Sequence, residues 1–180
     1  MQFRLGDYEG EMMQVLIETM LPMAAHDVLA RLRTTALLRH VAAPIMHFVP
    51  LDPPEFPEEW AKGKYRVATR LFGLIPLGEQ TIDISFDGSS KDAYAVRDNG
   101  HGDLARRWDH RINVVAIDDR WTRYRDTVAV EAGLLTPFVW LFVQGFYRHR
   151  QRRWRMLARA EASPLSRLRL AVAEALTAAA

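Results

Sequence analysis

Cysteine is absent from this chain of 180 residues. Its absence excludes disulfide bonds, thiolate metal ligands and cysteine nucleophiles, and it is compatible with a reducing compartment. Lysine is scarce as well, because 21 of the 24 basic residues are arginines. The formal net charge is only +2, yet basic residues crowd between Arg148 and Arg169. Positive charge is therefore a local feature of this sequence.

The chain also lacks a long uninterrupted apolar run. Its most apolar stretch, residues 132–147, is interrupted by Pro137, Gln144 and Gly145. This stretch falls short of the roughly 20 residues that cross a bilayer. The opening residues, MQFRLGDYEGEM, lack the basic start and apolar core of a secretory signal. We therefore expect a cytoplasmic protein without a transmembrane helix.

No linker rich in glycine, serine or proline divides the interior of the chain. Hydrophobic residues make up 49% and charged residues 26%, as in ordinary globular domains. We expect one domain over residues 1–162, followed at 163–180 by an amphipathic helical extension. This extension packs either on its own domain or on a second copy of the chain, which would make a homodimer.

Hydrophobic periodicity predicts the order of the elements. We expect strands over residues 12–21, 45–51, 64–74, 79–86, 92–98, 104–117 and 121–132, short helices over 24–32 and 34–41, and a long helix over 134–160. Turns are expected at residues 75–78, 87–90, 99–102 and 118–120. Along the long helix, an apolar stripe is expected from Trp140, Val143, Tyr147, Trp154 and Leu157. The result is an α+β domain with an antiparallel meander.

Four segments carry a likeness to a known family: RLFGLIPLGEQTI (70–82), RRWDHRI (106–112), TRYRD (122–126) and FVWLFVQGFYRHRQRRW (138–154). Together with the element order, they resemble the START-like helix-grip superfamily, also called SRPBCC or polyketide-cyclase-like, and a bacterial subgroup of it. The resemblance implies a curved antiparallel sheet of six or seven strands, wrapped around the long C-terminal helix, with two short helices after the first strand. It also implies a cavity between sheet and helix for a lipid, sterol, polyketide or similar molecule.

Alternation assigns the aromatic side chains of the strands to the concave face of the sheet. From the long helix we expect Phe138, Phe142 and Phe146 to face the same space. A concave apolar pocket with a few placed polar groups is the usual form of a small-molecule site. The alternative is that these side chains only pack the core.

Polar residues on the inward face are more informative, because buried polar groups need partners. The pattern places five there: Thr69, Gln80, Arg106, His110 and Asp126. A three-residue turn at 118–120 sets Ile112 opposite Asp126, which makes His110 and Asp126 diagonal neighbours. We expect this pair to orient the polar end of a ligand, with Trp108 and Tyr124 beside it. The alternative role is a hydrogen bond within the core.

The sequence thus predicts a carrier or sensor of an apolar molecule, with ligand-binding residues Thr69, Trp108, His110, Tyr124, Asp126, Phe142 and Phe146. The rival prediction is a cyclase, aromatase or hydrolase that uses His110 or Asp126 to move a proton in the same cavity. No serine is identifiable as a nucleophile, so no catalytic residue is assigned.

Cofactor and metal chemistry find no support in the sequence. The six histidines show no recognised ligand spacing, and Gly100 and Gly102 form a lone G-x-G away from any strand-to-helix turn. The segment YRHRQRRWRMLAR (147–159) mixes arginines with Trp154, a pattern compatible with nucleic acid, an acidic partner or an anionic membrane. We expect no nucleic acid; peripheral membrane contact stays open beside a purely solvated helix face.

Overall fold

The computed structural model describes residues 12–87 and 93–163. Its seven strands are Met13–Leu21 (β1), Met46–Asp52 (β2), Gly63–Leu71 (β3), Ile75–Asp87 (β4), Ala93–Gly102 (β5), Arg107–Ala116 (β6) and Thr122–Glu131 (β7). The helices are Ala25–Leu32 (α1), Thr35–Ala42 (α2), the short 3₁₀ turn Gly133–Leu135 (η1) and Thr136–Glu161 (α3).

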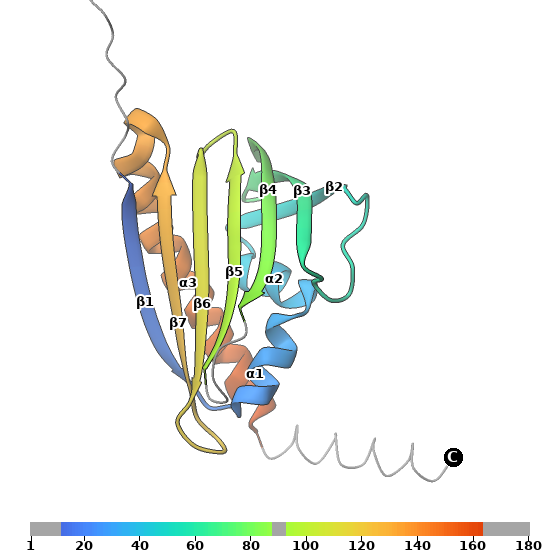
Figure 1. Ribbon diagram of the computed structural model, residues 1–180, viewed down its shortest axis with the longest axis vertical. Helices are drawn as coiled ribbons and strands as arrows, with labels where there is room; N and C mark the ends of the chain where they lie inside the picture. Colours follow the sequence, from blue (N-terminus) through green and yellow to red (C-terminus); the bar gives the residue numbers. More distant parts are fainter. Residues whose placement is uncertain (1–11, 88–92, 164–180) are drawn as a thin grey trace, which may run out of the picture.

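All seven strands join one antiparallel sheet in the order β1-β7-β6-β5-β4-β3-β2. Figure 1 shows α3 crossing behind this sheet. The first and last strands along the chain, β1 and β7, lie side by side. The two short helices α1 and α2 follow β1 along the chain. The α+β helix-grip architecture expected from the sequence is confirmed.

Local sequence explains where the helices begin. The side chain of Thr34 accepts a hydrogen bond from the backbone N–H of Leu37, which caps α2. Gly133 adopts a φ of 58°, a left-handed conformation that ends the run of β7. Pro137 follows in the first turn of α3, where its missing N–H costs no hydrogen bond.

Two of the expected turns are wrong. Residues 75–78 are the start of β4, and the turn before it lies at Phe72 and Gly73, which have φ of 53° and 73°. Residues 99–102 continue β5. A Cβ atom at Gly100 would lie 2.4 Å from the carbonyl oxygen of Thr81. This glycine therefore serves the close approach of two strands rather than a turn.

The expected apolar stripe of α3 is largely confirmed. Val143, Tyr147 and Trp154 are buried against the sheet and α2. The inward position expected for Phe138 is wrong, since 72% of its surface is exposed. Each four-residue step overshoots a full helical turn by about 40°, so Phe138 has rotated away from the face that carries Phe146.

The β3 and β4 alternation is confirmed as well. Tyr65, Val67 and Thr69 are buried, while Arg66 and Arg70 on the other face of β3 are exposed. The inward position expected for Arg106 is wrong. That residue lies in the loop before β6 and is exposed, so strand alternation does not apply to it.

Candidate functional site

A cavity opens between the concave face of the sheet and the helices. Its empty space is about 1100 Å³, a figure that includes open solvent at the mouth. Most of the wall is apolar and comes from α2 and from strands β2 to β6, with Leu37, Met46, Ile82, Ile84, Val96 and Ile112 among its residues. Such a wall suits a hydrophobic molecule.

Ionisable side chains interrupt this apolar wall, among them Glu79, Asp98, His101, His110 and Arg150. Asp98 of β5 and His110 of β6 are Cα partners in the sheet, so both enter the cavity at the same level. Arg150 reaches the cavity from α3, and its charge acts on both of them. One part of the cavity therefore combines a carboxyl, an imidazole and a guanidinium.

The structure separates the predicted site residues into two groups. Five of them line the cavity: Thr69, Trp108, His110, Phe142 and Phe146. Tyr124 and Asp126 lie outside its lining and border a second, smaller pocket beside Trp154. The hydroxyl of Thr69 already donates to the carbonyl oxygen of Gly78, at 3.0 Å.

The predicted pairing of His110 with Asp126 is present. Ile112 is the Cα partner of Asp126 and His110 that of Val128, as the short turn required. The Nε2 atom of His110 lies 2.7 Å from Oδ1 of Asp126. Tyr124 also donates to this oxygen, at 3.1 Å.

Asp126 has a further partner in α3. The Nε2 atom of Gln151 donates to its second oxygen, Oδ2, at 3.0 Å, and to the carbonyl oxygen of Ile17, at 2.8 Å. With only 1% of its surface exposed, Asp126 thus receives three donors and lies behind the wall of the cavity. Its direct role is to hold His110, which is the member of the pair that lines the cavity.

The pKa shifts of His110 and Asp126 decide which of the two side chains carries the shared proton. Burial lowers the pKa of His110, and the hydrogen bond with Asp126 only partly offsets this effect. Burial would raise the pKa of Asp126, but hydrogen bonds from His110 and Gln151 and the charge of Arg150 hold it below its ordinary value. The carboxylate is therefore ionised and the imidazole neutral, so Nε2 carries the proton. The other ring nitrogen, Nδ1, keeps a lone pair and has no hydrogen-bond partner among the described residues.

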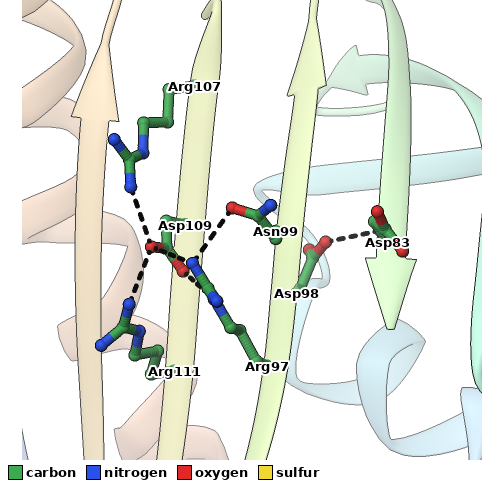
Figure 2. Close-up of polar contacts among 7 residues, drawn as sticks. All are labelled: Asp83, Arg97, Asp98, Asn99, Arg107, Asp109 and Arg111. Atoms are coloured by element: carbon green, nitrogen blue, oxygen red, sulfur yellow. Dashed lines mark hydrogen bonds and ion pairs between the residues drawn. The ribbon is translucent and has the colours of Figure 1, made fainter. Parts of the chain in front are cut away.

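Asp98 is held in a different way. Its Oδ1 accepts the backbone N–H of Asp83 at 2.8 Å, a link drawn between β5 and β4 in Figure 2. Burial raises the pKa of Asp98 to about 7, against the lowering effects of that hydrogen bond and of Arg150. Near neutral pH this carboxyl is therefore poised between its protonated and ionised forms.

Arg150 packs on two aromatic rings of its own helix. Its guanidinium carbon lies 4.8 Å from the ring centroid of Tyr147 and 5.7 Å from that of Phe146. The spacing is that of neighbours one helical turn apart, which permits cation–π contact. Burial alone would lower the pKa of Arg150, but the nearby tyrosines and carboxylates raise it, so the group stays charged.

Sequence reasoning missed both Asp98 and Arg150. Asp98 is two residues after Val96 and shares its face of β5, a signal hidden by the wrong turn at 99–102. Arg150 continues the four-residue series of Phe142 and Phe146 along α3. In both cases the spacing from a neighbouring inward-facing residue indicated that the side chain faces the cavity.

Other arginines of α3 have structural partners. Arg153 donates to the carbonyl oxygen of His40 in α2, and Arg155 donates to Thr19 in β1, each at 2.8 Å. These contacts join the helix to α2 and to an edge of the sheet. The arginine-rich segment is thus only partly a solvated face.

A second charged cluster lies on the opposite face of the sheet. Figure 2 shows Asp109 of β6 surrounded by three arginines, Arg97, Arg107 and Arg111. Arg97 contacts both carboxylate oxygens, at 2.8 and 2.9 Å. Its hydrogen bonds are the main reason that the pKa of Asp109 is lowered. The cluster stabilises pairing of β5 with β6 and takes no part in lining the cavity.

The order of strands, the long C-terminal helix and the cavity beneath it define a START-like helix-grip fold, the fold shared by the SRPBCC and polyketide-cyclase-like proteins. No protein-family profile matches this sequence, and no curated protein is significantly similar to it. The evidence for the fold is therefore structural.

Solved structures with this fold are distant in sequence. The Zhui aromatase/cyclase of Streptomyces sp. R1128 matches with a TM-score of 0.62 at 10% identity, over 86% of this chain and 98% of that one. A START superfamily protein of Mycobacterium smegmatis gives 0.55 at 12%, over 84% and 99%. Norcoclaurine synthase of Thalictrum flavum, a point mutant in complex with a transition state analogue, gives 0.56 at 11%, over 85% and 98%.

The described residues contain neither a membrane-spanning helix nor a cluster of metal ligands. Among residues 12–87 and 93–163, no helix is long and apolar enough to cross a membrane. Over the same ranges, no three histidine, aspartate or glutamate side chains gather in a way that would hold a metal ion.

Proposed function

We propose that this chain binds a hydrophobic small molecule, of the lipid, sterol or polyketide kind, between the sheet and α3. The observation that carries the proposal is an apolar cavity in which the charge of Arg150 acts on two other lining groups, Asp98 and His110. Burial of apolar ligand surface supplies affinity, and these groups orient the polar end.

The predicted residues take graded roles in this proposal. Trp108, Phe142 and Phe146 supply aromatic wall. His110 meets the polar end of the ligand, while Asp126, which accepts a hydrogen bond from Tyr124, holds the imidazole from behind. Norcoclaurine synthase from Thalictrum flavum, of similar fold, has been solved with dopamine and hydroxybenzaldehyde, which supports a small organic ligand here.

A cavity-filling variant tests the proposal. Nile red, an uncharged dye whose fluorescence rises in apolar surroundings, should bind the wild type, and Leu77→Trp should weaken binding because Leu77 lines the cavity. The control is Leu74→Trp, since Leu74 belongs to the same hairpin but is 84% exposed. Thermal melting shows whether both variants fold. Equal dye binding by both folded variants and the wild type would refute a ligand cavity.

Native mass spectrometry of the purified protein would identify a copurifying molecule.

A second candidate is an enzyme of the cyclase, aromatase or hydrolase kind. The observation that favours it is the pairing of a carboxyl with a pKa of about 7, Asp98, and a neutral imidazole, His110. A proton donor and a proton acceptor at one level of a cavity suit general acid–base chemistry. Incubation with polyketide-like and ester compounds, followed by mass spectrometry, tests it. Conversion by the wild type that Asp98→Asn abolishes, with binding intact, would establish the enzyme; binding without conversion favours the carrier.

We also propose two partners, an anionic membrane and a second copy of the chain. The arginines of α3 favour contact with an anionic membrane, and vesicle flotation with anionic lipid tests it. Association through residues 163–180, which lie almost wholly outside the described residues, would give a homodimer. Truncation after Glu161 followed by size measurement tests that association.

A further inference from the structure

Arg150 stands apart from the other arginines that α3 turns toward the protein. Arg153 and Arg155 each donate a hydrogen bond to a neighbouring element. Within the described residues, Arg150 has no hydrogen bond and no carboxylate oxygen within 4.0 Å. It is half-buried and lines the cavity. A guanidinium removed from bulk water and left without an anion is costly unless a partner arrives.

The stacking of Arg150 leaves its donors available. Contact with Tyr147 and Phe146 uses the flat face of the guanidinium, at 4.8 and 5.7 Å from the ring centroids. The N–H groups lie around the edge of that plane, in a fork that matches the two oxygens of a carboxylate. The aromatic support therefore orients the group without using its hydrogen bonds.

Asp126 and Asp98 both act on the charge of Arg150, but neither forms a direct ion pair with it. Asp126 already receives donors from His110, Tyr124 and Gln151. Asp98 is poised near neutral pH between its protonated and ionised forms, because burial disfavours its charge. The cavity thus contains a guanidinium that has no directly paired anion among the described residues.

On these grounds we infer that the cavity takes a hydrophobic carboxylic acid, whose carboxylate pairs with Arg150 while its hydrocarbon part lies along the apolar wall. The inference rests on the proposed function, since it names the class of ligand for the same cavity. An amine would meet the charge of Arg150 unfavourably, and an alcohol would forgo the charged pair.

Binding of a carboxylate also affects Asp98. A second negative charge in the cavity favours the protonated form of Asp98, which is then able to donate a hydrogen bond to the ligand. The groups that act on Asp98 are Asp83 of β4, Asp109 of β6, and Tyr147 and Arg150 of α3, and His110 of β6 is its Cα partner. Uptake of a carboxylate near pH 7 should therefore be accompanied by uptake of part of a proton.

Three probes of equal chain length test the inference: octanoate, 1-octanol and octylamine, measured by titration calorimetry at pH 7. We expect wild-type protein to bind octanoate at least about tenfold more tightly than octanol, and octylamine most weakly. Calorimetry in buffers of different ionisation enthalpy should reveal the proton uptake with octanoate. This comparison needs no variant, so it does not depend on how a substitution folds.

Two variants test whether Arg150 causes the preference for octanoate over octanol. Arg150→Met should lower octanoate affinity at least about tenfold and leave octanol within about twofold. The control is Arg148→Met, since Arg148 is exposed and, within residues 12–87 and 93–163, bonds only to Gln144 of its own helix. Octanol binding as tight as octanoate, tightest binding of octylamine, or an unaffected Arg150→Met would each overturn the inference while leaving hydrophobic binding standing. Failure of all three probes would overturn the proposed function with it.

Discussion

Asp98 and His110 are Cα partners on neighbouring strands, and both side chains line the same cavity. Their environments push them toward neutral forms by the same cause, because burial raises the pKa of the acid and lowers that of the imidazole. The site therefore has a donor and an acceptor side by side without a fixed charge on either. Arg150 supplies the fixed charge.

The first prediction concerns Asp98→Asn. With the pKa of Asp98 raised from 3.8 to about 7, the folded chain keeps a proton that the unfolded chain has lost, so wild-type stability falls as pH rises through this window. Asparagine keeps an oxygen for the N–H of Asp83 and removes the charge. The variant should be more stable than wild type at pH 8 by about 1–4 kcal/mol, and much less so at pH 4, in urea unfolding.

Asp103→Asn is the matched control for that experiment. Asp103 also accepts a backbone N–H of β4, that of Glu79, at 2.8 Å, but it is exposed. Because Asp103 is exposed, its replacement should change the stability by no more than about 0.5 kcal/mol in the same urea unfolding. Parallel pH dependence of wild type and Asp98→Asn would contradict the raised pKa.

The second prediction concerns the proton on His110. Since Asp126 is ionised, nitrogen NMR at pH 7 should find Nε2 protonated and Nδ1 bare. The folded chain resists a proton that the unfolded chain accepts near pH 6.5, so the contribution of His110 to stability is lost as pH falls below that value. An imidazolium signal from His110 at pH 7 would contradict this assignment.

The third prediction is that Asp126→Asn destabilises the fold. The change places an amide where three donors converge, so we expect a loss of about 2–4 kcal/mol at pH 7 in urea unfolding. The pKa of Asp126 lies below 3.8, so its contribution is present above that pH and is lost as pH falls through the folded-state pKa. Exposed Asp119→Asn provides the comparison, and similar stabilities for the two variants would refute the role of Asp126.

The fourth prediction contrasts two glycines. Gly100→Ala should cost about 2 kcal/mol or more, because its new Cβ would lie 2.4 Å from the backbone oxygen of Thr81. Gly145→Ala should stabilise the protein by about 0.5–1 kcal/mol, because Gly145 lies within α3 and a Cβ there meets nothing within 4 Å. Both effects are measured by thermal or urea unfolding. A tolerated alanine at position 100 would mean that the strands can move apart.

The sequence correctly predicted the direction of side chains in strands that have one buried face and one solvent-exposed face. Thr69 and Ile82 illustrate this case, because strict alternation sorts their strands unambiguously. It also predicted the contact of His110 with Asp126, since a short turn fixes the register of a hairpin. It failed at residues 99–102, where glycines usually signal turns but here bring two strands together.

The depth of a side chain was harder to predict than its face. Tyr124 and Asp126 lie on the inward face as expected, yet other side chains separate them from the main cavity. Arg150 was assigned with its neighbours to a solvated surface, although it lines the cavity. Alternation and helical periodicity give direction only, whereas depth depends on the curvature of the sheet and on what α3 places above it.

Two consecutive residues of α3 face two parts of the molecule: Arg150 lines the cavity, while Gln151 bonds to Asp126 and to the carbonyl oxygen of Ile17 in β1. No residue of β1 lines the cavity. A ligand that immobilises Arg150 also restrains the turn of helix that fastens this edge strand. Binding of a ligand in the cavity should therefore slow deuterium uptake by the backbone amides of the edge strand β1.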